Sequence, residues 1–205
     1  MERIFVEIGD TVKARCGWCT SDPLYQRYHD EEWGVPTRDA QALFELLMLE
    51  GMQAGLSWLT VLRKRRHMRE VFFEFAPERL VRMTTREIDA RLRDPGIIRH
   101  RGKIEALKQN AKAYLASIEE RPFAERLWSF VDDAPRQNRP RGLRDVPSHT
   151  QEAEAMSKAL KRLGFTFVGP TICYAFMQAG GLVNDHVVGC FRRTQVGRAK
   201  RCVVA

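Results

Sequence analysis

The sequence contains no apolar stretch long enough to cross a lipid bilayer. Its apolar runs, such as residues 46–49 and 180–183, are no longer than six residues, whereas a spanning helix needs about 20. Residues 1–7 include acidic side chains and no long apolar segment, which argues against a secretion signal. We therefore expect a cytoplasmic protein with no membrane partner.

Acidic residues are in the minority. The chain has 26 Asp and Glu against 34 Lys and Arg, a formal net charge of +8. A basic chain suits a polyanion such as nucleic acid, because each cation that neutralises a phosphate releases counterions. A merely soluble basic surface is the alternative. Hydrophobic residues make up 44% and charged residues 29% of the 205 residues, which indicates one globular domain rather than a disordered chain.

Cysteine is scarce. The five cysteines are Cys16, Cys19, Cys173, Cys190 and Cys202. In a cytosolic chain, an odd number of cysteines favours free thiols or a metal site over a disulfide framework.

Helical periodicity dominates the sequence and predicts an all-α fold. The expected helices cover residues 39–49, 57–75, 84–92, 101–118, 123–131 and 151–163, with a last one beginning at Pro170. Only residues 165–168 resemble a strand, and four residues cannot build a sheet. Residues 132–149 are rich in Pro, Arg and Asp and predict an irregular loop. We expect the termini, residues 1–14 and 192–205, to be loosely ordered.

A short turn at residues 94–98 separates two of the expected helices. Pro95 ends the first helix, Gly96 permits a tight turn, and Ile97 and Ile98 can pack between the helices. The backbone N–H groups at the start of the second helix favour an anion. Four basic residues surround that point: Arg99, His100, Arg101 and Lys103. The pattern has the form of a helix-hairpin-helix, which grips the DNA backbone without reading sequence; a plain αα-corner with a solvated basic face is the alternative.

Two cysteines and two histidines have spacings that suit a metal. Cys16 and His29 are separated by twelve residues, and His186 and Cys190 by three, so the second pair lies one helical turn apart. Two thiolates and two imidazoles form the closed tetrahedral set of a structural zinc site, which here would join the start of the fold to its end. Core packing is the alternative role for these residues. Cys19, in a C-x-x-C motif with Cys16, could instead be a ligand or half of a redox pair.

An acidic residue stands at the end of an apolar helix. Glu50 follows the run at 46–49, where burying a carboxylate is costly unless a donor reaches it. Five aromatic residues are near it in sequence: Trp18, Tyr25, Tyr28, Trp33 and Trp58. An arginine partner or a wet helix end would explain Glu50 alone. Rings beside a buried acid also fit a slot for a flat, nitrogen-rich base.

The sequence resembles the 3-methyladenine DNA glycosylase I family over residues 15–191. The similarity is carried by several motifs in the same order: RCGW at 15–18, DPLY at 22–25, YHD at 28–30, EWGVP at 32–36, LEG at 49–51, QAGLSW at 53–58, GIIRHRGKI at 96–104, FVG at 167–169 and VNDH at 183–186. The segment before Arg15, together with Cys19 and Cys202, falls outside this pattern.

The resemblance implies a single all-α, helix-hairpin-helix glycosylase domain at residues 15–191, with the hairpin near 86–118, an N-terminal extension at 1–14 and a basic tail at 192–205. The implied ligands of a structural Zn²⁺ are Cys16, His29, His186 and Cys190. Glu50 is the implied base-recognising catalytic acid; Tyr28 and Trp58 are the stacking walls and Trp33 a further pocket residue. The expected DNA contacts are Gly55, Leu56, Gly96, Ile98, Arg101 and Lys103.

The implied activity is hydrolysis of the N-glycosidic bond of 3-methyladenine in base-excision repair, by a monomer acting on alkylated double-stranded DNA. Methylation at N3 makes the base cationic, so it leaves readily once it is flipped out of the helix. The resemblance implies that the strong catalytic Asp of related glycosylases is absent, so we expect Glu50 to select the charged base electrostatically. A zinc-stapled DNA-binding module without catalysis is the main alternative. A zinc hydrolase would need an open coordination position, which four protein ligands deny.

Overall fold

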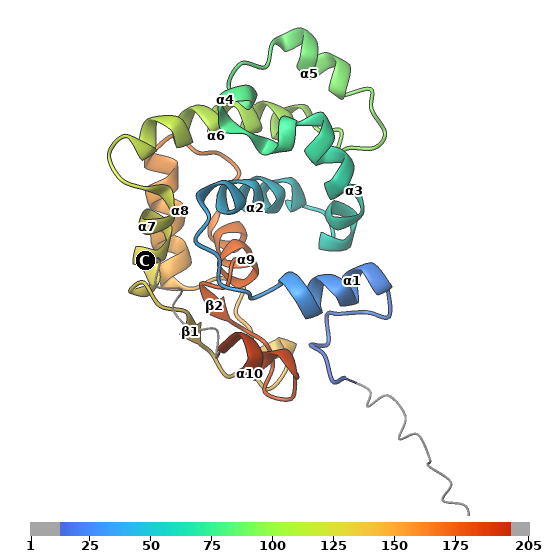
Figure 1. The fold of residues 1–205 in the computed structure, drawn as a ribbon, viewed down its shortest axis with the longest axis vertical. Helices are drawn as coiled ribbons and strands as arrows, with labels where there is room; N and C mark the ends of the chain where they lie inside the picture. The colour runs from blue at the N-terminus through green and yellow to red at the C-terminus, as the bar shows by residue number, and fades with distance from the viewer. Residues whose placement is uncertain (1–12, 198–205) are drawn as a thin grey trace, which may run out of the picture.

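The computed structural model describes residues 13–197 of the chain (Figure 1). Its helices are α1 (Pro23–Arg27), α2 (Ala40–Gln53), α3 (Trp58–Val71), α4 (Pro77–Leu80), α5 (Thr85–Arg91), α6 (Arg101–Ile118), α7 (Phe123–Trp128), α8 (Gln151–Arg162), α9 (Pro170–Ala179) and α10 (Arg192–Gly197). A π-helical turn covers Tyr28–Glu32, and 3₁₀ turns cover Phe73–Phe75, Ser129–Val131 and Leu143–Asp145. Strands β1 (Arg136–Gln137) and β2 (Val183–Asn184) pair in parallel. The predicted helical class is confirmed.

Several helices begin at the residues that the sequence predicts. The Asp39 carboxylate accepts a hydrogen bond of 2.7 Å from the Ala42 N–H at the start of α2. The Ser57 hydroxyl caps α3 by accepting from the Thr60 N–H at 3.2 Å. Thr84 and Glu87 form the expected capping box at α5. Such caps satisfy backbone donors that a helix leaves unpaired.

Other local predictions need correction. The helix expected over 57–75 ends at Val71, because the backbone takes positive φ at Phe73, Glu74 and Phe75. Residues 165–168 form no strand. The loop at 132–149 is not wholly irregular, because it contains the 3₁₀ turn at Leu143–Asp145 and β1, which pairs with the distant β2. The tail begins with an ordered helix, α10, rather than a loose segment; the expectations for residues 1–12, for 198–205 and for Cys202 lie outside the described residues.

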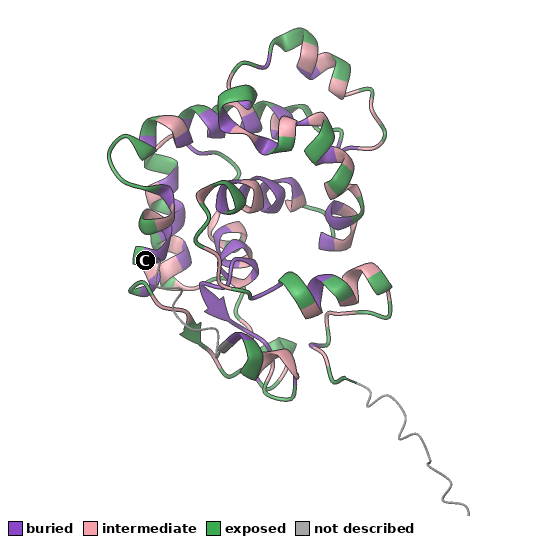
Figure 2. Cartoon of the chain, viewed as in Figure 1, coloured by how far each residue is buried: buried purple, intermediate pink, exposed green. Residues whose placement is uncertain are grey.

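Helix α2 lies at the centre of the molecule. It packs against α3, α6 and α9, and Figure 2 shows α2 and α9 mostly in the purple of buried residues. Leu43, Phe44 and Leu47 on α2 have no exposed surface, in agreement with its apolar sequence on nearly all sides. The central position of α2 buries its C-terminal end, where Glu50 lies.

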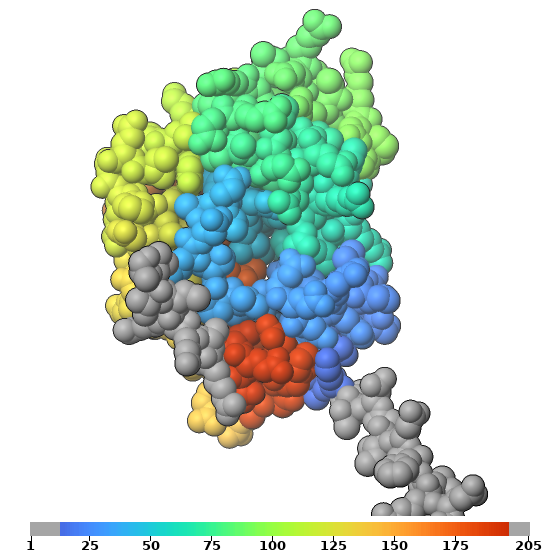
Figure 3. Space-filling model, in the orientation of Figure 1, coloured from blue at the N-terminus to red at the C-terminus, as the bar shows by residue number. Residues whose placement is uncertain are grey.

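The beginning and the end of the described chain are side by side. Figure 3 shows the blue N-terminal segment against the red segment that includes α10. The Phe191 N–H donates to the Ala14 carbonyl at 3.0 Å, so the contact includes the backbone. Among residues 13–197, none of the helices is both long enough and apolar enough to cross a membrane.

Candidate active site and metal-binding cluster

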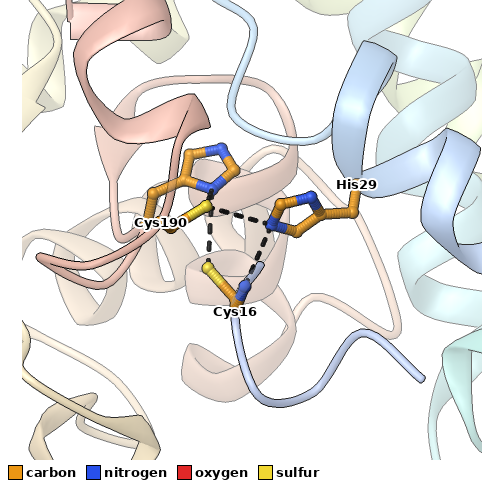
Figure 4. Close-up of side chains that lie close together, drawn as sticks. Cys16, His29 and Cys190 are labelled. Atoms are coloured by element: carbon orange, nitrogen blue, oxygen red, sulfur yellow. Dashed lines mark hydrogen bonds between the residues drawn. The ribbon is translucent and has the colours of Figure 1, made fainter. Parts of the chain in front are cut away.

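Cys16, His29, His186 and Cys190 come together where the two ends of the chain meet. All four residues are buried, and their ligand atoms lie within 4.8 Å of one another. Cys190 Sγ is 3.4 Å from His29 Nε2 and 3.4 Å from His186 Nδ1, and Cys16 Sγ is 3.5 Å from His186 Nδ1. Figure 4 shows the two thiols and the His29 ring pointing toward one another. The predicted set of four residues therefore forms one cluster.

The outer nitrogen of each imidazole is held by an acceptor. His29 Nδ1 lies 2.8 Å from Asp30 Oδ1, and Arg15 fixes the Asp30 carboxylate through two bonds of 2.8 and 2.7 Å. His186 Nε2 donates to the Trp33 carbonyl at 3.2 Å. A ring whose outer nitrogen donates in this way directs the lone pair of its other nitrogen toward the cysteines, as metal-bound histidines do.

The dimensions and charge of this cluster fit a tetrahedral metal ion. Bonds of about 2.0–2.3 Å to nitrogen and sulfur place neighbouring ligands about 3.5 Å apart, which matches the three distances above. The hydrogen bond with Cys190 and burial raise the pKa of the Cys16 thiol. If both cysteines were ionised, their two negative charges would repel each other, and a bound cation would offset that repulsion. Cys19 is outside the cluster, with its thiol directed at the Thr20 carbonyl.

A second group of predicted residues lines a cavity of about 280 Å³ next to this cluster. Its walls include all the aromatic residues that the sequence placed near Glu50, and Glu50 itself. The lining residues are Trp18, Tyr25, Tyr28, Trp33, Glu50, Gln53, Trp58, Leu143, Val146, Ala175, Gln178 and Asp185. The structure thus confirms the predicted arrangement, in which Glu50 and the aromatic rings line one cavity.

The aromatic walls are in contact with one another. The Trp18 ring lies 5.0 Å from the centroids of both Tyr25 and Trp33, and the Tyr28 and Trp58 rings are 5.4 Å apart. The π-helical turn positions Tyr28 on the cavity and the next residue, His29, in the cysteine–histidine cluster. Insertions of this kind in helices are frequent at functional sites.

Glu50 has no polar partner in the described part of the chain. It is 2% exposed, and its Oε2 atom is buried without a hydrogen bond. Burial raises the pKa of the Glu50 carboxyl to about 8, since a dry site disfavours the charged form. The indole N–H of Trp58 is likewise buried without an acceptor among the described residues. Two polar groups on the cavity wall are therefore free to pair with a ligand.

Six of the twelve residues that line the cavity were not predicted from the sequence. Gln53 and Asp185 stand inside the motifs that carried the resemblance, but no role was assigned to them. Ala175 and Gln178 lie one turn apart on α9, which reads as an ordinary core helix. Leu143 and Val146 come from the irregular loop. Gln53 lies one helical turn after Glu50 on α2, so local spacing could have found it. Only the tertiary fold brings the other five residues to the cavity, and no local sequence signal could have found them.

The turn between α2 and α3 carries Gly55 and Leu56. Gly55 has a φ of +75° and no atom near the position that a side chain would take, a conformation that favours glycine. Leu56 is 42% exposed, which is unusual for a leucine beside a buried helix. The pair therefore forms an apolar projection at the end of the helix that carries Glu50.

The hairpin between α5 and α6 is held by side chains of α3. The His67 Nε2 atom lies 2.7 Å from Asp94, whose other oxygen accepts from the Gly96 N–H at 2.7 Å. A side chain at Gly96 would collide with the His67 ring at 2.4 Å. Ile98 is buried between the helices as predicted, so its side chain is not available for the expected contact with DNA. The exposed Arg101 pairs with Asp89 and Glu105.

The expectation that Lys103 adds positive charge to the hairpin surface is wrong. Lys103 is 6% exposed, and its Nζ atom donates to the Met52 and Ala54 carbonyls at 2.9 and 2.6 Å. Desolvation lowers the pKa of its ammonium. The His100 ring nitrogen also occupies one donor at the start of α6, the Lys103 N–H. Lys103 thus joins α6 to the end of α2 and does not face solvent.

Comparison with known proteins gives a consistent result. The methyladenine glycosylase family profile matches residues 18–193. The DNA-3-methyladenine glycosylase 1 of Escherichia coli K12 is 53% identical over 177 residues, which are 86% of this chain and 95% of that protein. The DNA-3-methyladenine glycosylase of Haemophilus influenzae is 51% identical over 86% of this chain and 96% of its own.

Solved structures agree in fold. A crystal structure of a 3-methyladenine DNA glycosylase I superposes with a TM-score of 0.85 at 52% identity, covering 87% of this chain and 98% of the other. A structure described as the basis of 3-methyladenine recognition by the Staphylococcus aureus enzyme has a TM-score of 0.85 at 39% identity, with 87% and 96% coverage. The chain belongs to the 3-methyladenine DNA glycosylase I family.

Proposed function

We propose that this protein is a DNA glycosylase that releases 3-methyladenine from alkylated double-stranded DNA. Two relatives at 53% and 51% identity carry that name, and one structure at 38% identity with a TM-score of 0.84 is described as a complex with 3-methyladenine. The single observation in this chain that supports the activity is Glu50: a carboxyl group buried among rings, with no hydrogen-bond partner of its own in residues 13–197.

The bond to be broken needs little acid catalysis. N3 methylation gives the base a positive charge while it is still attached to the sugar, so the N-glycosidic bond cleaves with its electron pair moving into the base. Water then adds its oxygen to C1′ of the sugar and loses a proton. The task left to the protein is to extract the base, hold it and favour its charged form.

Glu50 would supply that preference. In the empty cavity its pKa of about 8 means that the carboxyl carries a proton near neutral pH. A cationic base lowers that pKa again, because an opposite charge at close range favours the carboxylate. Binding of the charged base and loss of the Glu50 proton are therefore coupled, and an uncharged adenine gains much less from the site. Tyr28, Trp33 and Trp58 would stack on the base or border it.

The cysteine–histidine cluster would hold a structural Zn²⁺. Two thiolates and two imidazoles occupy all four positions of a tetrahedral ion, so such an ion supplies folding energy and leaves no position for substrate. Cys16 and His29 precede α2, whereas His186 and Cys190 follow β2. Their common ion would fix the N-terminal wall of the cavity to its C-terminal wall.

The α5–α6 hairpin and the Gly55–Leu56 projection would contact DNA. We assign the α5–α6 unit to the helix-hairpin-helix class, with Gly96 at its turn, Ile98 packed beneath it and Arg101 near the phosphates. Leu56 would fill the gap that the extruded nucleotide leaves in the duplex. The monomeric state and the cytoplasmic location remain predictions.

Incubation with methylated DNA tests the function. The wild-type protein should release 3-methyladenine, detected by chromatography, and leave abasic sites. Glu50→Gln should lower release about 100-fold or more and weaken binding of free 3-methyladenine in parallel. Glu45→Gln is the matched control, since Glu45 is on the same helix but pairs with Arg69 at 3.5 Å. DNA binding without any base release would identify a non-enzymatic DNA-binding module instead.

A further inference from the structure

Asp185 organises a buried hydrogen-bond network behind the cavity wall. It is 4% exposed. Its Oδ1 atom accepts from the Asn138 amide at 2.7 Å, and its Oδ2 atom accepts from the Tyr174 hydroxyl at 2.6 Å and from the Gln178 amide nitrogen at 2.7 Å. With three donors directed at it, this carboxylate is fixed in place.

The Gln178 amide can be oriented in only one way beside that carboxylate. Oxygen and nitrogen of an amide are hard to distinguish by shape, so the hydrogen-bond partners decide. The carboxylate accepts, so Gln178 must present its NH₂ group to Asp185. Its carbonyl oxygen, Oε1, is then the free polar atom of the side chain, and no described residue donates to it. Gln178 lines the same cavity as Glu50.

We propose that Gln178 is a specificity-determining residue whose amide oxygen, oriented by Asp185, acts with Glu50 as a pair of acceptors for the 6-amino group of the methylated base. This inference rests on the glycosylase function proposed above. It adds that the site recognises the edge of the base that carries the 6-amino group. The 6-amino group of an adenine carries two N–H donors, one for each acceptor. A purine with an oxygen at position 6 would place an acceptor against the Gln178 oxygen and against the ionised Glu50 carboxylate, so the two kinds of purine are compared above pH 8, where Glu50 is ionised.

The orientation of Gln178 makes this discrimination strong. An unconstrained glutamine could turn its amide and offer an N–H to a 6-oxo purine. Here that rotation would bring the Gln178 oxygen against the Asp185 carboxylate, which repels it. A site of this kind rejects the wrong analogue because its polar groups are left unpaired or opposed.

The test compares two free bases that differ at position 6: 3-methyladenine and 3-methylhypoxanthine. Binding is measured by quenching of tryptophan fluorescence, since Trp18, Trp33 and Trp58 line the cavity. The wild-type protein should prefer 3-methyladenine by about 100-fold or more. Gln178→Met, which keeps the side-chain length but removes the amide, should reduce this preference about tenfold or more.

Tyr174→Phe is the matched control. It removes another donor from the same Asp185 oxygen but leaves the Gln178 amide in place, so the preference should stay within about twofold of wild type. A wild-type protein that binds both bases equally overturns the inference, as does an unchanged preference in Gln178→Met. An equal loss in both variants also overturns it, because the network as a whole would then be responsible.

A second assay keeps this inference separate from the proposed function. If the wild-type protein releases no methylated purine from alkylated DNA, the glycosylase function itself fails. If it releases 3-methyladenine and Gln178→Met keeps the wild-type preference at position 6, only the role of Gln178 fails.

Discussion

The cysteine–histidine cluster and the cavity around Glu50 lie side by side and both contain buried polar groups. They differ in whether those polar groups have partners. In the cysteine–histidine cluster, the outer nitrogen of each ring has an acceptor and the inner atoms face one another. In the adjacent cavity, Glu50 and the Trp58 indole have no partner among the described residues. Trp33 belongs to both regions, because its ring borders the cavity while its carbonyl accepts from His186.

The difference separates stability from function. A buried polar group with its partners in place holds a fold together, whereas a buried group without one destabilises the fold until a ligand arrives. The cluster should therefore respond to mutation through stability. The cavity should respond through activity, and its polar groups should cost the empty protein free energy.

The largest expected effect comes from Cys190→Ser. Loss of one ligand of the proposed Zn²⁺ should reduce the zinc content sharply and lower the unfolding temperature by more than about 10 °C, because the ion would no longer join the ends of the fold. Metal analysis and thermal unfolding measure this directly. The fraction of the variant that stays folded should keep most of its excision activity. A metal-free variant with normal stability and activity would contradict a structural metal.

Glu50→Gln should raise the stability of the protein at pH 8, whereas Cys190→Ser lowers it. The folded-state pKa of Glu50 is raised from 4.5 to about 8, so the folded protein holds a proton that the unfolded chain releases. Stability from this group is complete below pH 4.5 and is lost as pH rises to about 8, at up to about 1.4 kcal/mol per pH unit. The variant should lack this decline and be more stable than wild type at pH 8. Chemical denaturation at several pH values checks it, and parallel curves for the two proteins would contradict a dry Glu50.

Lys103→Met should affect stability but not DNA electrostatics. The Lys103 ammonium satisfies two carbonyls at the end of α2, so its loss should cost about 1–3 kcal/mol. The slope of log affinity for DNA against log salt concentration should not change, because Lys103 faces no phosphate. A shallower slope, measured by fluorescence anisotropy, would return Lys103 to the DNA-binding surface.

Cys19→Ser should have the smallest effect. Cys19 lies outside the cluster and contacts only the Thr20 carbonyl through its thiol. Zinc content should equal that of wild type, and stability should stay within about 0.5 kcal/mol. Loss of metal in this variant would make Cys19 a ligand and break the contrast between the two regions.

Much of this arrangement could be predicted from the sequence. Asp39, Ser57 and Thr84 are of residue types that cap the N-terminus of a helix. The apolar residues that precede Glu50 in the sequence already indicated that it is buried. The set of four cysteine and histidine ligands and the roles of the pocket aromatics were predicted from the resemblance to the family. The helix starts depend on neighbours in sequence, where local physical chemistry decides.

The rest depends on contacts between distant segments. Lys103 follows three basic neighbours and looks like a surface cation, yet the α2 carbonyls that bind it are about 50 residues away in sequence. Gln178 is one polar residue on an apolar helix, and only the position of Asp185 fixes its amide. The pairing of β1 with β2 has no local signal at two residues per strand.

The most direct test of the central claim is the pKa of the Glu50 carboxyl, followed by carbon-13 NMR with Glu50→Gln to assign the signal. We predict a value near 8 in the protein alone and a clear decrease when a cationic 3,9-dialkyladenine is bound, because that compound keeps the charge that the methylated base has while it is joined to its sugar. A value close to the ordinary 4.5 in the protein alone, unchanged by that compound, would show that this carboxyl is solvated and does not select a charged ligand.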